Sequence, residues 1–280
     1  MQMKKRILPM VIRLGIVGML IALCDAPLGQ TAEAFQWFPK KQVAKPNLLP
    51  TRLHKTVVVD PGHGGIDGGT SRGGLLEKTI TLDIAKNLAL ELDRAGFDVT
   101  MTRRTDIDCS GLFPSPLSGR HRRDLQNRLD LLRKARAVGF LSIHVNSSAN
   151  PSDRGPLVFY TVHSEASQQL ASLVQAKLNA LADTTQRPIG RKNLFVIRHA
   201  PCPAILAEVG YVTNDRDAIK LRQPMYLKQV AHAIAVGAIP FLRQQSTPNA
   251  VVGNPNDDWV PPALSPAVVQ SGSSNMAQSR

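Results

Sequence analysis

Through the middle of the chain, short apolar runs alternate with longer stretches in which apolar residues recur every three or four positions. The short runs favour β-strands, and they span residues 57–59, 97–101, 140–143, 157–162, 194–197 and 204–207. The longer stretches favour amphipathic helices, and they span residues 79–95, 119–136, 164–183 and 226–242. Strands that alternate with helices predict an α/β fold. We expect one domain, with a mostly parallel or mixed sheet of about six strands and helices on both faces.

The stretch 119–136 is the most basic of these helices, with six arginines and one lysine. Such a run raises the question of nucleic-acid binding. However, Leu125, Leu129 and Leu132 form an apolar stripe, and two aspartates interrupt the charge. The pattern therefore favours a helix with a solvated basic face, which would suit contact with anionic wall material.

The N-terminus is typical of an export signal. Four basic residues accompany an apolar run of eleven residues, 14–24, and a small-residue site ends at Ala34. A membrane-spanning helix needs about 20 apolar residues, so residues 1–34 favour a cleaved signal peptide. The alternative is an uncleaved anchor that begins at Ile7 and tolerates Arg13. Both interpretations place the rest of the chain outside the cytoplasm.

The remaining sequence divides into three parts. Residues 35–54 have no apolar period and are expected to form a spacer. Residues 55–243 contain the predicted strands and helices and form the expected folded domain. Residues 244–280 are rich in Ser, Pro, Asn and Gln, which predicts a disordered tail.

Charge and cysteine content narrow the range of partners. The whole chain carries a net charge of +13, and removal of residues 1–34 leaves 30 basic and 19 acidic side chains, a net charge of +11. Outside a cell, this charge favours anionic wall polymers or a membrane surface, and we expect no nucleic-acid partner. Cys109 and Cys202 remain after cleavage and could form one disulfide, although their spacing matches no disulfide framework.

Four side chains are candidates for chemistry because of where they fall in this pattern. His63 follows the first strand in a glycine-rich loop, Glu77 precedes a helix, His144 ends a strand, and Glu208 follows a very apolar run. Each has an ordinary explanation alone: Glu77 could favour a helix N-terminus, and His144 could be a buried core histidine. Together they lie where an α/β sheet builds its site. Two histidines and one carboxylate make a zinc set, and a second carboxylate is then available as a base.

Five segments resemble the zinc-dependent N-acetylmuramoyl-L-alanine amidases of bacterial cell walls, and they occur in order between residues 57 and 242. They read VVVDPGHGGIDGG, GLLEKTITLDIA, VTMTRRTD, FLSIHVNSS and ILAEVGYVTN. The resemblance is greatest to the export-signal-bearing form of spore formers that helps prepare the spore cortex for germination.

The resemblance implies a site and a reaction. It assigns one Zn²⁺ per chain to His63, Glu77 and His144, and it makes Glu208 the catalytic general base and acid. The reaction would be hydrolysis of the amide between the lactyl group of N-acetylmuramic acid and L-alanine in peptidoglycan. Two alternatives stay open: a zinc peptidase that cuts the stem peptide, and a non-catalytic wall-binding module. An activating partner protein is also left open.

Overall fold

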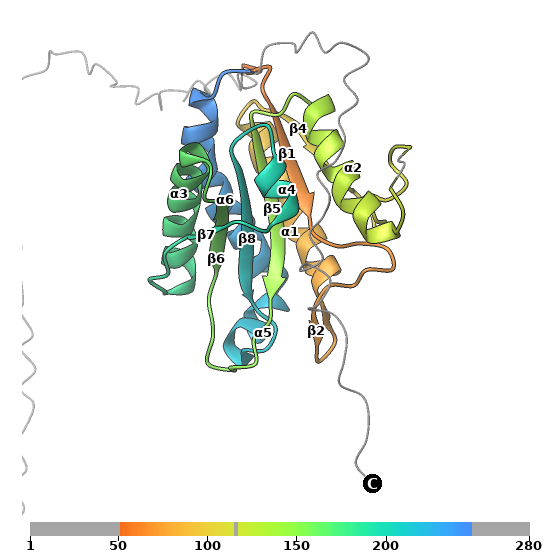
Figure 1. Cartoon of the computed structure of the whole chain (residues 1–280). Coiled ribbons are helices and arrows are strands. Elements are labelled where there is room, and N and C mark those ends of the chain that lie inside the picture. Colours follow the sequence, from red (N-terminus) through yellow and green to blue (C-terminus); the bar gives the residue numbers. More distant parts are fainter. Residues whose placement is uncertain (1–50, 115–116, 248–280) are drawn as a thin grey trace, which may run out of the picture. The chain divides into compact units, whose positions relative to one another are not determined.

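The computed structural model describes residues 51–114 and 117–247. The expected signal peptide, most of the expected spacer and most of the expected tail lie outside the described residues. Within them, the chain forms a six-stranded sheet with helices on both faces and a separate two-stranded hairpin (Figure 1). The predicted α/β class is confirmed.

The sheet is mixed, with a parallel centre. Its strand order is β4-β1-β5-β8-β6-β7; the first four strands are parallel, β6 is antiparallel to β8, and β7 is parallel to β6. The hairpin pairs β2 with β3. The bounds are β1 Thr56–Pro61, β2 Ser71–Arg72, β3 Leu75–Leu76, β4 Asp98–Met101, β5 Gly139–Asn146, β6 Leu157–Thr161, β7 Ile189–Arg191 and β8 Ala204–Tyr211.

The two faces of the sheet are covered unequally. Three long helices pack on one face, and their apolar residues form the larger core with alternate residues of β1, β5 and β8. Two helices pack on part of the other face and form a smaller core. The long helices are α1 Glu77–Arg94, α3 Glu165–Ala182 and α6 Pro224–Gln244; the second face carries α2 Arg120–Lys134 and α4 Phe195–His199; α5 Asp215–Leu221 follows β8. The part of the second face that α2 and α4 leave uncovered is available for a site.

Helix α6 is apolar and long enough to cross a membrane, the one such helix in the described ranges. It packs against both α1 and α3, and 61% of its most apolar window is buried. Its apolar composition is therefore explained by its position in the core of the domain.

One predicted strand is wrong. Residues 194–197 lie in and just before helix α4, and the strand at the β6 end of the sheet is the short β7. A four-residue apolar run does not distinguish a strand from a helix, and here Leu194 and Ile197 both pack against the smaller core. The sequence analysis also missed α5, although Asn214 caps it by accepting hydrogen bonds from the N–H groups of Arg216 and Asp217.

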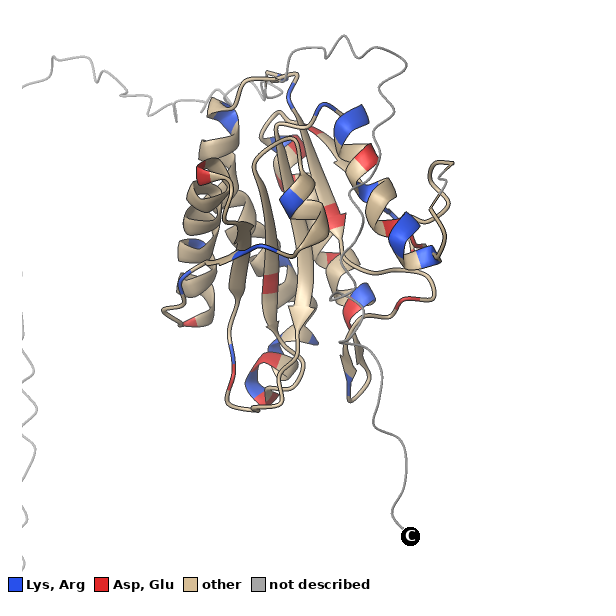
Figure 2. Cartoon of the chain, viewed as in Figure 1, with Lys and Arg blue, Asp and Glu red and all other residues tan. Residues whose placement is uncertain are grey.

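The predicted solvated face of α2 is only partly correct. Basic residues do occur along this helix (Figure 2), but Arg128 is buried and forms ion pairs with Asp60 and Asp124. Arg128 is thus an internal structural charge, and the surface charge of α2 comes from the other basic residues.

Two further expectations concern the spacer before the domain and the pairing of the two cysteines. The last residues of the expected spacer contact the domain, because Arg52 donates to Asp93 and the Leu53 N–H donates to the Gly96 carbonyl. Cys109 and Cys202 are both free thiols, so no disulfide joins them.

Candidate metal centre

The loop after β1 holds His63 in an unusual backbone conformation. His63 has φ 61°, a left-handed value that non-glycine residues rarely adopt. Its Nε2 lies 3.1 Å from Glu77 Oε1, and its Nδ1 lies 3.0 Å from Asp67 Oδ1. The imidazole is therefore aimed by its strained backbone and flanked by two carboxylates.

Glu77 is the first residue of α1 and its side chain is almost fully buried. One carboxylate oxygen, Oε1, accepts a 2.9 Å hydrogen bond from the Val145 N–H, and the other, Oε2, accepts a 2.7 Å bond from the Thr70 N–H. These two backbone donors fix the carboxylate between the loop and β5.

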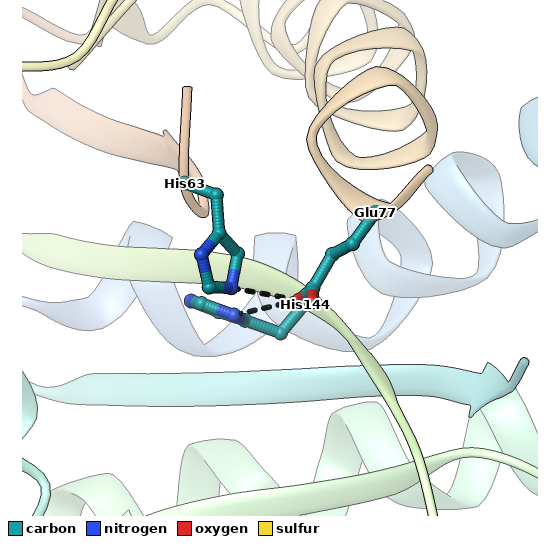
Figure 3. Close-up of side chains that lie close together, drawn as sticks. All are labelled: His63, Glu77 and His144. Carbon is teal, nitrogen blue, oxygen red and sulfur yellow. Dashed lines mark hydrogen bonds and ion pairs between the residues drawn. The ribbon is translucent and has the colours of Figure 1, made fainter. Parts of the chain in front are cut away.

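His144 comes from β5 and completes the cluster. Its Nδ1 lies 3.0 Å from Glu77 Oε1, and its ring centroid is 5.0 Å from that of His63 (Figure 3). One ligand atom from each of His63, Glu77 and His144 lies within 4.8 Å of the others. Two imidazole nitrogens and a carboxylate oxygen at this spacing fit zinc, which favours nitrogen and oxygen donors in sites of three protein ligands.

Glycines make room for this cluster. A Cβ at Gly62 would clash with the His144 ring, and a Cβ at Gly69 would clash with both Glu77 and His63. Gly69 also has φ 67°, which favours glycine. The glycines of the loop are therefore required for the side chains to meet.

The pKa values of His63 and Glu77 are shifted because the two side chains lie close to each other. Burial disfavours the charged imidazole of His63, but the neighbouring Glu77 and Asp67 outweigh it and raise the His63 pKa from 6.5 to about 9 in the metal-free protein. Burial likewise opposes ionisation of Glu77, but hydrogen bonds from His144 and His63 hold its pKa well below the ordinary range. A cation at this centre must therefore displace a proton from His63.

Glu208 lies beside the cluster. It is the register partner of His144 on the neighbouring parallel strand, so both side chains lie on the same face of the sheet. Its Oε2 is buried and has no hydrogen-bond partner within residues 51–114 and 117–247. Burial, aided by the negative charge of Glu77, raises the Glu208 pKa from 4.5 to about 7. A carboxyl with this pKa can accept and return a proton near neutral pH.

A cavity of about 230 Å³ adjoins the cluster between α2 and α4. His63 and His144 line it, and although several polar residues also line it, most of its exposed wall area is apolar. These apolar walls include Leu125, Phe140, Leu194, Phe195, Ile197 and Leu206. The candidate centre thus opens onto an apolar crevice.

The structure brings together all four side chains singled out from the sequence. It adds Asp67, which the sequence analysis missed although it lies only four residues after His63. A carboxylate beside the second nitrogen of a metal-binding histidine orients the ring and raises its basicity. The position of Asp67, four residues after His63 in the same loop, was the sequence signal that could have identified it.

The arrangement defines a class of protein. Two histidines and a carboxylate lie at the carboxyl end of an α/β sheet, with a second buried carboxylate next to them. This arrangement fits a hydrolase that uses a metal ion, because the three-residue donor set could hold an ion and a further carboxylate lies beside it.

Comparison with known proteins identifies the family. A family model described as N-acetylmuramoyl-L-alanine amidase matches residues 57–239, well over half of the chain. The chain belongs to this family of amide hydrolases.

Individual relatives agree with this assignment. The germination-specific N-acetylmuramoyl-L-alanine amidase of Bacillus subtilis is 32% identical over 205 residues, which cover 73% of this chain and 86% of that protein. The amidase LytC of Bacillus subtilis is 34% identical over 191 residues, 68% of this chain but 36% of LytC. The chain thus spans about a third of LytC's length. The structure of the Clostridioides difficile CwlD amidase in complex with the GerS lipoprotein matches with a TM-score of 0.63 and 27% identity, covering 68% of this chain and 98% of that one.

Proposed function

We propose that this chain is a zinc-dependent peptidoglycan amidase that cleaves the bond between the lactyl group of N-acetylmuramic acid and L-alanine. His63, Glu77 and His144 would hold one zinc ion, and Glu208 would transfer the proton. The observation that carries the proposal is the three-residue donor set with Glu208 in register beside His144. Family membership supports the choice of the scissile amide.

The protein's own groups support this chemistry. When bound in such a site, zinc supplies Lewis acidity, which favours ionisation of a water and polarises a carbonyl. Glu208 takes one proton from the attacking water and gives that proton to the departing nitrogen of L-alanine as the C–N bond breaks. The products are a lactyl carboxylate on the glycan and a free stem peptide. Asp67 holds the His63 ring in place throughout.

We infer that the enzyme works on the outer side of the cytoplasmic membrane. The expected signal peptide, residues 1–34, and the basic net charge support export to a wall rich in anionic polymers. The likeness to the germination-specific relative supports a role in germination. The lipoprotein complex of the CwlD amidase supports a search for a partner protein of this chain.

Mass spectrometry of digested peptidoglycan tests the proposal. Purified protein with zinc should release intact stem peptides that begin with a free L-alanine amine, and chelation should stop the release. A Glu208→Gln variant serves as the catalytically impaired control. Shortened stems or free amino acids would instead indicate a peptidase. Wall binding without any product, and without bound zinc, would indicate a binding module.

A further inference from the structure

Arg103 is a buried residue of the VTMTRRTD segment. Its side chain donates hydrogen bonds to the loop that carries His63, to the first turns of α1 and to the Thr105 carbonyl. It follows β4 and is 2% exposed. Its Nε donates to the Pro61 carbonyl at 3.0 Å, and its Nη2 donates to the carbonyls of Gly62 at 2.9 Å and Lys78 at 2.8 Å. One guanidinium therefore ties the loop that carries His63 to the first turn of the helix that carries Glu77.

This charge is costly to bury. No carboxylate of the described chain lies within 4.0 Å of Arg103, so its donors go to carbonyls and one hydroxyl. Burial and the nearby positive charge of Arg128 both lower the pKa of Arg103. A buried charge without an ion-pair partner destabilises a fold unless its hydrogen bonds are well satisfied. An apolar side chain would leave the carbonyls of Pro61, Gly62 and Lys78 without these donors, so what Arg103 contributes is its hydrogen-bond geometry.

Arg128 also holds this loop. Its Nη2 donates to the His63 carbonyl at 2.9 Å and its Nη1 donates to the Pro61 carbonyl at 3.2 Å. Unlike Arg103, it is neutralised by Asp60 and Asp124. Three consecutive carbonyls, those of residues 61–63, are thus held by two guanidiniums.

We propose that Arg103 is a positioning residue that sets the separation of His63 and Glu77 and thereby the zinc affinity of the site. The left-handed backbone of His63 would otherwise relax, because such a conformation persists only where surrounding contacts fix it. Arg103 acts through the backbone and touches neither zinc nor substrate. The inference rests on the proposed zinc site, but it is tested without turnover.

The test uses Arg103→Lys and Arg103→Met, with zinc affinity measured by competition with a chelator. Lysine keeps the charge but has one nitrogen, so it does not reproduce the fork that bonds Pro61, Gly62 and Lys78. Substitution of residues that position metal ligands typically costs about 10-fold to 100-fold in metal affinity, and we expect a loss in this range for both variants. The visible absorption of the Co²⁺-substituted protein should also change, because it reports ligand geometry.

A matched control separates positioning from general stability. Gln175 is equally buried in α3, and its side chain bonds the Val158 N–H and the Pro156 carbonyl, away from the loop. Gln175→Met should lower the unfolding midpoint of the metal-free protein while leaving zinc affinity within about 2-fold of the wild type.

Three outcomes would overturn the inference. The first is that both Arg103 variants keep wild-type zinc affinity and an unchanged Co²⁺ spectrum. The second is that they lose no more affinity than the Gln175→Met control. The third is that Arg103→Lys fails to fold while the control folds, which would make Arg103 a determinant of the fold alone. If the wild type itself bound no zinc, the proposed function would fail first, so the two failures are distinguishable.

Discussion

Replacement of Glu208 by glutamine should separate metal binding from chemistry. Glutamine keeps the shape of the side chain and the register position beside His144, but it cannot accept a proton. Loss of a general base typically costs about 100-fold to 10,000-fold in rate. Zinc content should barely change, because Glu208 lies outside the group of residues whose ligand atoms converge.

The same substitution should stabilise the metal-free protein. The Glu208 pKa rises from 4.5 to about 7 on folding, a shift equivalent to about 3 kcal/mol at 1.36 kcal/mol per pKa unit. A group whose pKa is raised by folding contributes stability that is complete below its unfolded pKa. That contribution is lost as pH rises through its folded pKa. The wild type should therefore lose up to about 3 kcal/mol from this group between pH 4.5 and 7, and Glu208→Gln should not.

Two measurements check this pair of effects. Stem-peptide release by mass spectrometry gives the rate, and urea unfolding in EDTA at pH 5 and pH 8 gives the stability difference. The assigned roles would be exchanged if Glu208→Gln emptied the metal site while Glu77→Gln kept full zinc and lost turnover. An unfolding difference that is the same at both pH values would refute the argument from burial of the carboxylate.

Four further predictions concern the candidate metal centre and the C-terminal tail. Glu77→Gln removes a charged ligand, so zinc affinity measured by chelator competition should fall first, with activity partly restored by added zinc. Because the His63 pKa is about 9 in the metal-free protein, zinc affinity should rise about tenfold per pH unit from pH 7 towards 9. Calorimetry in two buffers should show about one proton released at pH 7, and no proton release would contradict the pairing with Glu77. Gly69→Ala places a Cβ against Glu77 at a positive φ and should lower zinc affinity at least about tenfold, whereas Gly74→Ala, with open space around it, should not. Truncation after Gln245 should leave zinc content and product release unchanged, because α6 ends at Gln244 and the tail is poor in large apolar residues; loss of activity with zinc retained would instead make the tail a substrate or partner arm.

The sequence pattern singled out four residues that the structure brings together, because each stands beside a strong local signal. His63 and His144 follow apolar runs, and in a parallel sheet such positions converge at one edge. Glu208 was placed after its strand, whereas it lies within β8, but its register with His144 leaves it at the same edge. Parallel pairing alone therefore carried these residues to one place.

What the pattern did not predict depends on tertiary packing. The run 194–197 lies in and just before α4, and β7 pairs with β6 at the edge of the sheet. A short apolar run contains no information about which neighbour it will meet. Arg128 was grouped with a solvated face because its partner Asp60 lies 68 residues away in the sequence. Charges buried by distant partners look the same in a sequence as charges on a surface.

The pairing of β5 with β8 has a consequence for how this enzyme tolerates change. The separation of His144 from Glu208 is set by the spacing of neighbouring strands, about 4.8 Å, and by a ladder of backbone hydrogen bonds. Loops around the centre can therefore be lengthened or exchanged without altering that separation. A single residue inserted into β8 before Glu208 would instead turn its carboxylate towards the opposite face of the sheet. The placement of Glu208 relative to His144 is thus determined by the sheet and not by the surrounding loops.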